Sequence, residues 1–292
     1  MLGTYGIPTD VETAPEWQSD LLDLDAYLAR IGYTGPRTPS AGTLHGVLRA
    51  HMGAIAFENL DIALGRPVSI DLGPIQDKLV TRGRGGYCYE NNLLFAAALD
   101  RLGFPVTRLL ARIRQGEERR RFRTHTVLLV RADDRVWLAD TGYGYSCQMQ
   151  AVPLEHGARV DTYDWSWRLV ADGPDWILQI PHEDPARRAA GDWFDMYSFR
   201  QEPQYRIDFE AAHYVSSTRP GSPFVGQVVV QRQEEKQRLL LRDKQLERRL
   251  PDGSSEVTEL SAADTVRALR EDFRIALTDE DARALLQHFA AK

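Results

Sequence analysis

The spacing of apolar residues changes along the chain and divides it into three zones. In the first zone apolar side chains recur every three or four residues, as they do along one face of an α-helix. This spacing predicts a helix over residues 21–31, a second helix with Thr43 as its N-cap, and a third that begins near Cys88 and ends before Gly103. The first third of the chain is therefore predicted to be helical.

Short runs rich in β-branched and aromatic residues replace the helical spacing in the middle of the chain. Turn-forming residues separate these runs, which is typical of an antiparallel sheet or barrel. The polar stretch 182–203 carries few strand signals, and we expect a long connection there. The predicted strands span residues 106–113, 124–130, 135–139, 165–171 and 176–180.

The last third of the chain mixes both patterns. Tight turns between alternating runs predict hairpins, and two helices follow, because Ser261 and Thr278 each stand three residues before an aspartate, as in a capping box. Helical, antiparallel and mixed zones together predict an α+β fold. The predicted hairpin strands span residues 225–231, 238–242, 245–250 and 257–260.

Composition narrows the choice of function. The 292 residues carry a formal net charge of −6, which disfavours nucleic acid as a partner because phosphate binding needs clustered basic residues. The chain has no apolar run of about 18 residues and no secretory leader pattern, so we expect a cytoplasmic protein without a membrane partner. Its two cysteines, Cys88 and Cys147, lack the spacing of a zinc site, and no metal is predicted.

The basic run 119–123 leaves two interpretations open. Charge runs of this kind are usually solvated loops, and the run would then bind nothing. The alternative is a local site for an anionic ligand.

Cys88 is the strongest candidate for chemistry. It follows Gly85 and Gly86 and opens the third predicted helix. The positive end of a helix dipole favours the thiolate, which is the nucleophilic form of cysteine. A thiol nucleophile also needs an imidazole to take its proton and a carboxylate to orient that imidazole. We therefore expect a histidine and an acidic residue beside it.

His125 and Asp140 are the best-placed partners. His125 opens one predicted strand and Asp140 ends the next, so a hairpin would make them cross-strand neighbours. Each residue alone has a plain explanation, since a lone cysteine is usually a small buried hydrophobe and an aspartate before Thr-Gly usually forms a turn. His51 lies on the apolar stripe of the second helix and is interpreted as a core histidine.

Several stretches carry motifs that occur together in one family. The most specific is Arg-Gly-Gly-Tyr-Cys at 84–88, with His125 and Asp140 following in the family's order. With these motifs the chain resembles the arylamine N-acetyltransferases. The matching stretches are 27–33, 57–62, 84–92, 124–130 and 140–144, with further matches toward the C-terminus.

The resemblance implies a three-part fold that agrees with the zones above. It also implies a cysteine-proteinase-like triad of Cys88, His125 and Asp140. Acetyl-CoA would donate its acetyl group to the cysteine, and an arylamine, arylhydrazine or N-hydroxyarylamine would take it, with no permanently bound cofactor. The implied parts are 1–104, a helical bundle with the nucleophile; 105–203, a β-barrel with the histidine and aspartate; 204–221, a linker; and 222–292, an α/β lid.

The resemblance also implies which residues line the substrate sites. The sequence departs from the family at Ala56, Thr141 and Tyr143, which leaves the acceptor preference open. A CoA site would favour the anionic-ligand interpretation of the basic run. The implied acceptor-binding residues are Phe57, Tyr87, Tyr143, Tyr145 and Cys147. The implied CoA-binding residues are Arg121, Phe122, Thr218, Gly221, Ser222 and Phe224.

Other functions stay open as alternatives. An amide synthase, or a transferase that uses other acyl-CoA donors, would share the fold. A papain- or transglutaminase-like hydrolase would share the order of cysteine, histidine and aspartate, with water as its acceptor. A catalytically inactive binding protein would not depend on Cys88. Assembly into a homo-oligomer is also left open.

Overall fold

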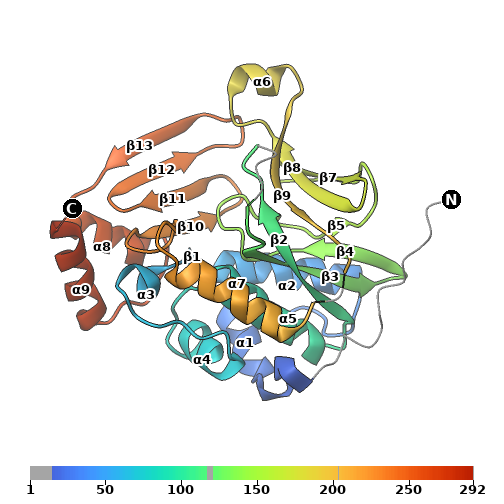
Figure 1. Ribbon diagram of the computed structural model, residues 1–292, viewed down its shortest axis with the longest axis horizontal. Coiled ribbons are helices and arrows are strands. Elements are labelled where there is room, and N and C mark those ends of the chain that lie inside the picture. The colour runs from blue at the N-terminus through green and yellow to red at the C-terminus, as the bar shows by residue number, and fades with distance from the viewer. Residues whose placement is uncertain (1–14, 117–120, 203, 292) are drawn as a thin grey trace.

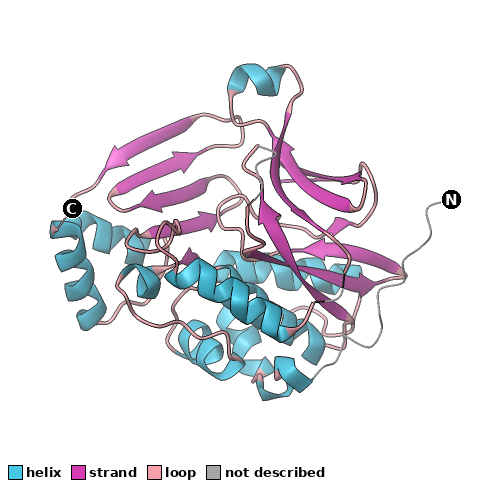
Figure 2. Cartoon of the chain, viewed as in Figure 1, coloured by secondary structure: helices cyan, strands magenta, loops and turns pink. Residues whose placement is uncertain are grey.

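The computed structural model describes residues 15–116, 121–202 and 204–291. Most helices gather on one side of the molecule and two sheets lie on the other, with a further pair of helices beside the C-terminal sheet and one short helix at the far end of the sheets (Figures 1 and 2). None of the described helices is both long and apolar enough to cross a lipid bilayer.

The N-terminal helices begin and end at residues that suit a helix end. α1 (Leu24–Ile31) ends at Gly32, whose φ of 67° favours glycine. α2 (Ala41–Ala54) begins after Ser40, whose hydroxyl accepts the Thr43 N–H at 3.1 Å, so the predicted cap at Thr43 is wrong. The other helical elements of this part are the 3₁₀ turns Pro15–Trp17 and Ser19–Leu21, α3 (Leu60–Ala63), α4 (Leu72–Gln76), a π-helical turn over Asp77–Thr81, and α5 (Cys88–Arg101).

Strands of the described residues form two antiparallel sheets. The larger sheet has eight strands in the order β5-β4-β3-β2-β9-β8-β7-β6, and its edge strand β5 approaches β6 and β7, which nearly closes the predicted barrel. Apolar side chains such as Trp167 and Met196 fill its interior. The strands are β2 (Val106–Ile113), β3 (His125–Ala132), β4 (Arg135–Ala139), β5 (Val152–Pro153), β6 (Arg159–Thr162), β7 (Trp165–Asp172), β8 (Asp175–Pro181) and β9 (Trp193–Phe199).

Regular elements occupy two stretches that the sequence predicted as connections. Strand β9 and the short helix α6 (Pro185–Ala189) lie within 182–203, and β9 pairs with both β2 and β8. Helix α7 (Arg206–Thr218) lies within the predicted linker 204–221 and buries Phe209 against the bundle. Both elements contribute residues near the candidate site.

The smaller sheet has five strands in the order β1-β10-β11-β12-β13. Its first strand, β1 (Phe57–Glu58), comes from the N-terminal part of the chain, so the sheet joins the bundle to the C-terminal part. Helices α8 (Ala262–Glu271) and α9 (Asp279–Ala290) cover one face of this sheet, and their N-caps are Ser261 and Thr278, as predicted. The other strands are β10 (Val229–Gln233), β11 (Arg238–Arg242), β12 (Gln245–Arg249) and β13 (Ser255–Glu259).

Candidate active site

Close backbone contacts fix the start of α5. Strand β1 runs beside the glycine pair: the Glu58 N–H donates to Gly86 O at 3.0 Å, and the Gly86 N–H donates to Ala56 O at 3.2 Å. A Cβ at Gly85 would lie 2.3 Å from Ala56 O, so only glycine fits there. This contact places Cys88 at the first position of α5, as the sequence predicted.

His125 and Asp140 are joined by a 2.7 Å contact between Nε2 and Oδ2, and both side chains are buried. The pairing of β3 with β4 sets Leu128 opposite Ala139, so Asp140 lies diagonal to His125 rather than directly opposite it. Because an ionised carboxylate only accepts hydrogen bonds, we assign the imidazole proton to Nε2. The other ring nitrogen, Nδ1, is then free to accept a proton.

Asn92 and Gly142 hold Asp140 in place. The Asn92 side-chain amide donates to Asp140 Oδ1 at 3.0 Å, and the Gly142 N–H donates to the same oxygen at 2.7 Å. Burial alone would raise the pKa of Asp140, but the imidazole of His125 and these two donors together lower it. Asn92 stands one turn after Cys88, so the helix that presents the thiol also orients the carboxylate.

Cys88 and His125 line one cavity of about 920 Å³. Burial raises the pKa of the Cys88 thiol and the charge of Asp140 raises it further, while the backbone N–H groups of Tyr89 and Cys88 lower it only in part. The N–H groups at the helix N-terminus therefore offset only part of the effect of burial on the pKa of the thiol. A thiolate here needs a cation beside it, which a protonated His125 would supply.

The residues predicted to bind an acceptor separate into two groups. Phe57, Tyr143 and Tyr145 line the cavity. Tyr87 and Cys147 are fully buried and are not among the described lining residues. The Cys147 sulfur accepts the Tyr143 N–H at 2.9 Å, so it holds the backbone of a residue that lines the cavity.

Most residues predicted to bind CoA also line the cavity: Arg121, Phe122, Gly221, Ser222 and Phe224. Thr218 is not among the described residues that line the cavity, and its hydroxyl donates to Tyr214 O at 2.5 Å. Two members of the basic run, Arg119 and Arg120, lie outside the described residues.

Sequence reasoning missed several residues of the site. Tyr197 on β9 contacts the ring of His125, with 5.0 Å between ring centroids, but its strand was predicted as a connection. Arg219, which follows the predicted CoA contact Thr218, and Arg242 on β11 also line the cavity, and the sequence analysis named neither. Asn92 could have been found, because it stands one helical turn after the candidate nucleophile.

The comparisons with known proteins agree with this architecture. The sequence pattern of the N-acetyltransferase family matches residues 40–282. An arylamine N-acetyltransferase of Mycolicibacterium smegmatis is 37% identical over 265 residues, which cover 88% of this chain and 94% of that protein. The structure of the Mycobacterium abscessus arylamine N-acetyltransferase matches with a TM-score of 0.89 and 34% identity, over 96% of this chain and 99% of the other.

A third match is the Mycobacterium marinum arylamine N-acetyltransferase in complex with CoA, with a TM-score of 0.83, 32% identity, and coverage of 91% of this chain and 98% of the other. Fold, cavity and family pattern together define an acyltransferase with an α+β fold and a central antiparallel barrel. The chain belongs to the arylamine N-acetyltransferase family.

Proposed function

We propose that the protein transfers an acetyl group from acetyl-CoA to an arylamine, an arylhydrazine or an N-hydroxyarylamine through a thioester on Cys88. The observation that carries this proposal is the buried 2.7 Å contact between His125 and Asp140 beside a cavity that Cys88 also lines. The contact leaves Nδ1 of the imidazole as the acceptor for the thiol proton. Family membership supports the proposed acceptor class.

In the first half of the reaction, His125 takes the thiol proton and the Cys88 thiolate attacks the acetyl carbonyl carbon of acetyl-CoA. The N–H of Cys88, at the open end of α5, is the donor that we assign to the developing oxyanion. The bond between the acetyl carbon and the CoA sulfur then breaks. The CoA thiolate takes the proton back from the imidazolium and leaves as the free thiol.

In the second half, the acceptor nitrogen, or the oxygen of an N-hydroxy group, attacks the thioester carbon. The bond from that carbon to the Cys88 sulfur breaks, and His125 moves the proton of the acceptor to the departing thiolate. Asp140 stabilises the imidazolium that forms in both halves. The two half-reactions share one site, so the kinetics should be ping-pong.

Basic side chains on one wall suit the phosphates of CoA. Arg112, Arg121 and Arg219 line the cavity from the barrel and from the end of α7, and the Arg219 guanidinium lies 4.9 Å from the centre of the Phe122 ring. Guanidinium groups bind phosphate oxygens with paired hydrogen bonds. The related M. marinum enzyme in complex with CoA supports this assignment.

The test is intact-protein mass spectrometry without an acceptor. The protein is mixed with acetyl-CoA, propionyl-CoA or malonyl-CoA, and para-anisidine is then added. We expect one acetyl group on the wild-type protein and on the Cys147→Ala variant, and none on Cys88→Ala. The adduct should disappear when the amine is added.

Three results would contradict the proposal. An adduct retained in Cys88→Ala would place the acyl group elsewhere. A protein that no CoA thioester modifies would favour a carrier-bound donor, as in an amide synthase. An adduct lost to water at the same rate with and without amine would indicate a hydrolase.

A further inference from the structure

The C-terminal sheet forms one wall of the cavity. Phe57 on β1 stands opposite Gln231 on β10, and both side chains line the cavity. Val229, two residues from Gln231, also lines it and stands opposite Arg242 on β11. Because directly paired residues share a face of a sheet and side chains alternate along each strand, these four residues project from the same face.

Arg242 is the charged residue on this apolar wall. It is exposed, and among the described residues its guanidinium has no hydrogen-bond or ion-pair partner. Glu183 is the only acidic residue among those described around the cavity, and it is already engaged. Its carboxylate contacts Arg249 at 2.9 Å and accepts the Tyr145 hydroxyl at 3.0 Å. The cavity therefore presents an uncompensated positive charge beside aromatic and aliphatic side chains.

We propose that Arg242 selects acceptors that carry an anionic group on the aromatic ring, away from the reacting amine. The inference rests on the proposed function, because it concerns the second substrate of that reaction. An aromatic ring would contact Phe57 and Val229 while its carboxylate or sulfonate meets the guanidinium. A neutral ring of the same shape would make the apolar contacts only.

The position of Arg242 assigns it to the acceptor rather than to CoA. The basic residues that suit CoA phosphates, Arg112, Arg121 and Arg219, come from the barrel and the end of α7. Arg242 comes from β11, on the wall that also carries Phe57. The two groups of cations thus belong to different walls of one cavity.

The experiment compares two acceptors that differ in charge and little in shape, para-aminobenzoate and para-aminobenzamide. The measured quantity is the ratio of their kcat/KM values, so differences in amine reactivity cancel between variants. We expect Arg242→Gln to lower this ratio about fivefold, the size of a partly solvated charge pair, while kcat/KM for the amide stays within about twofold. Added NaCl should lower the ratio for the wild type and leave it unchanged for Arg242→Gln.

The matched control is Arg135→Gln, an exposed strand arginine on β4 that is not among the described residues around the cavity. It should leave the ratio unchanged. Equal losses for both acceptors, or an unchanged ratio in Arg242→Gln, would overturn the proposal, as would a higher KM for acetyl-CoA with no change in the ratio. A wild-type protein that acetylates neither acceptor would instead contradict the proposed function.

Discussion

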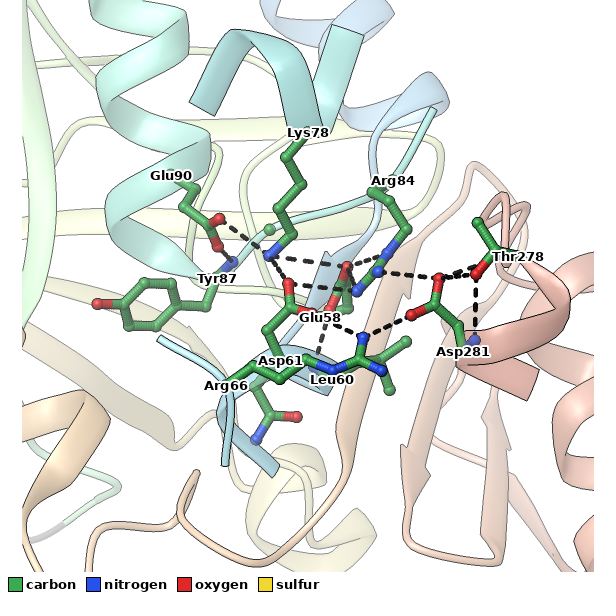
Figure 3. A network of polar contacts seen from close by, with 12 residues as sticks. Glu58, Leu60, Asp61, Arg66, Lys78, Arg84, Tyr87, Glu90, Thr278 and Asp281 are labelled. Atoms are coloured by element: carbon green, nitrogen blue, oxygen red, sulfur yellow. Dashed lines mark hydrogen bonds and ion pairs between the residues drawn. The ribbon is translucent and has the colours of Figure 1, made fainter. Parts of the chain in front are cut away.

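Cys88 and Glu90 stand two residues apart on α5 and belong to two polar regions of opposite character. Cys88 lines an open cavity together with His125, where the proposed reaction moves a proton. Glu90 belongs to a closed ion network, where the charges are fixed (Figure 3). The start of one helix therefore combines a reactive group with a rigid support, and the two functions can be tested separately.

The ion network centres on Lys78. Its Nζ lies 2.9 Å from a Glu90 oxygen, 2.8 Å from Asp61 and 4.0 Å from Glu58, and all of these side chains are largely buried. Burial alone would lower the pKa of Lys78, but the three carboxylates raise it, so the amine stays charged. The other Glu90 oxygen accepts the Tyr87 N–H at 3.0 Å. Lys78 thus holds the residue that caps α5.

The network also reaches the C-terminal part of the chain. Arg84 contacts Glu58 at 2.8 Å and Asp281 of α9 at 3.6 Å (Figure 3). Asp281 also caps its own helix through Thr278. This ion network beside the candidate site therefore joins the bundle, β1 and α9, and we expect it to govern stability rather than chemistry.

Of these substitutions, Asp140→Asn should have the largest effect, and the property that it changes should be activity. Asparagine cannot supply the negative charge that orients His125 and stabilises its protonated form. We expect kcat/KM for para-anisidine to fall by about 10³- to 10⁴-fold, the scale seen when the aspartate of such a triad becomes neutral. Asp175→Asn, which removes a carboxylate from the barrel surface, is the control and should act like the wild type. A loss below about tenfold would remove Asp140 from the mechanism.

Lys78→Met should instead act on stability. It leaves the carboxylates of Glu58, Asp61 and Glu90 without their shared cation, and breaking a buried ion pair in this way costs about 3–5 kcal/mol. Urea unfolding at pH 7 measures this loss, with the exposed Lys236→Met as control. The acetylation rate per folded molecule should stay within a few-fold of the wild type. A loss under about 1 kcal/mol would show that the network contributes little.

The elements that carry the three residues of the proposed triad were predictable because local chemistry sets each of them. Gly85 is required by its contact with Ala56, and the apolar run of α5 and its end before Gly103 are visible in the sequence. His125 opens one short apolar run and Asp140 follows the next, and a short turn joins the two strands. Local pattern was enough for these parts.

The rest of the site depends on contacts between distant segments. β1 has only two residues, so no periodicity reveals that it pairs with β10, more than 150 residues later, and that pairing builds the wall with Arg242. β9 was missed because polar residues precede it and a register shift interrupts its pairing with β8. The ion network joins α9 to the bundle in the same way, across most of the chain.

His51 supports the segment just before Cys88 through neutral hydrogen bonds. Lys78 supports it through charged contacts, so the two residues contrast. The Tyr27 hydroxyl donates to His51 Nδ1 at 2.9 Å, and His51 Nε2 donates to Asn91 Oδ1 at 3.0 Å. The Asn91 amide in turn donates to the carbonyl of Gly86. His51 is buried in the core, as the sequence predicted.

Burial keeps His51 in its neutral form, which predicts that the protein loses stability in acid. Burial lowers the pKa of His51 from its ordinary 6.5 to about 4. As pH falls through this window the unfolded chain takes up a proton and the folded chain does not, so the free energy of unfolding should fall by about 3 kcal/mol in total. His51→Phe cannot titrate and should show a flatter pH dependence in urea unfolding between pH 6.5 and 4. Equal slopes would contradict the prediction.

Gly142→Ala should give the smallest effect. It should lower both stability and activity, because Gly142 packs against the start of α5. An added Cβ would lie 2.7 Å from Cys88 Cα and 2.7 Å from the Asn92 side-chain nitrogen. The backbone must shift, at a cost of about 1–3 kcal/mol in unfolding, and the shift moves the N–H that binds Asp140. We also expect a roughly tenfold loss in kcat/KM, since small misplacements of catalytic groups are costly.

The control for this change is Gly53→Ala near the end of α2, where a Cβ would meet no atom within 4 Å. That substitution should leave activity unchanged and raise stability slightly, because alanine favours the helix. If Gly142→Ala lowers stability but not activity, the catalytic region tolerates strain that the packing does not. Chemistry and stability could then be changed separately even at a residue that directly contacts Cys88.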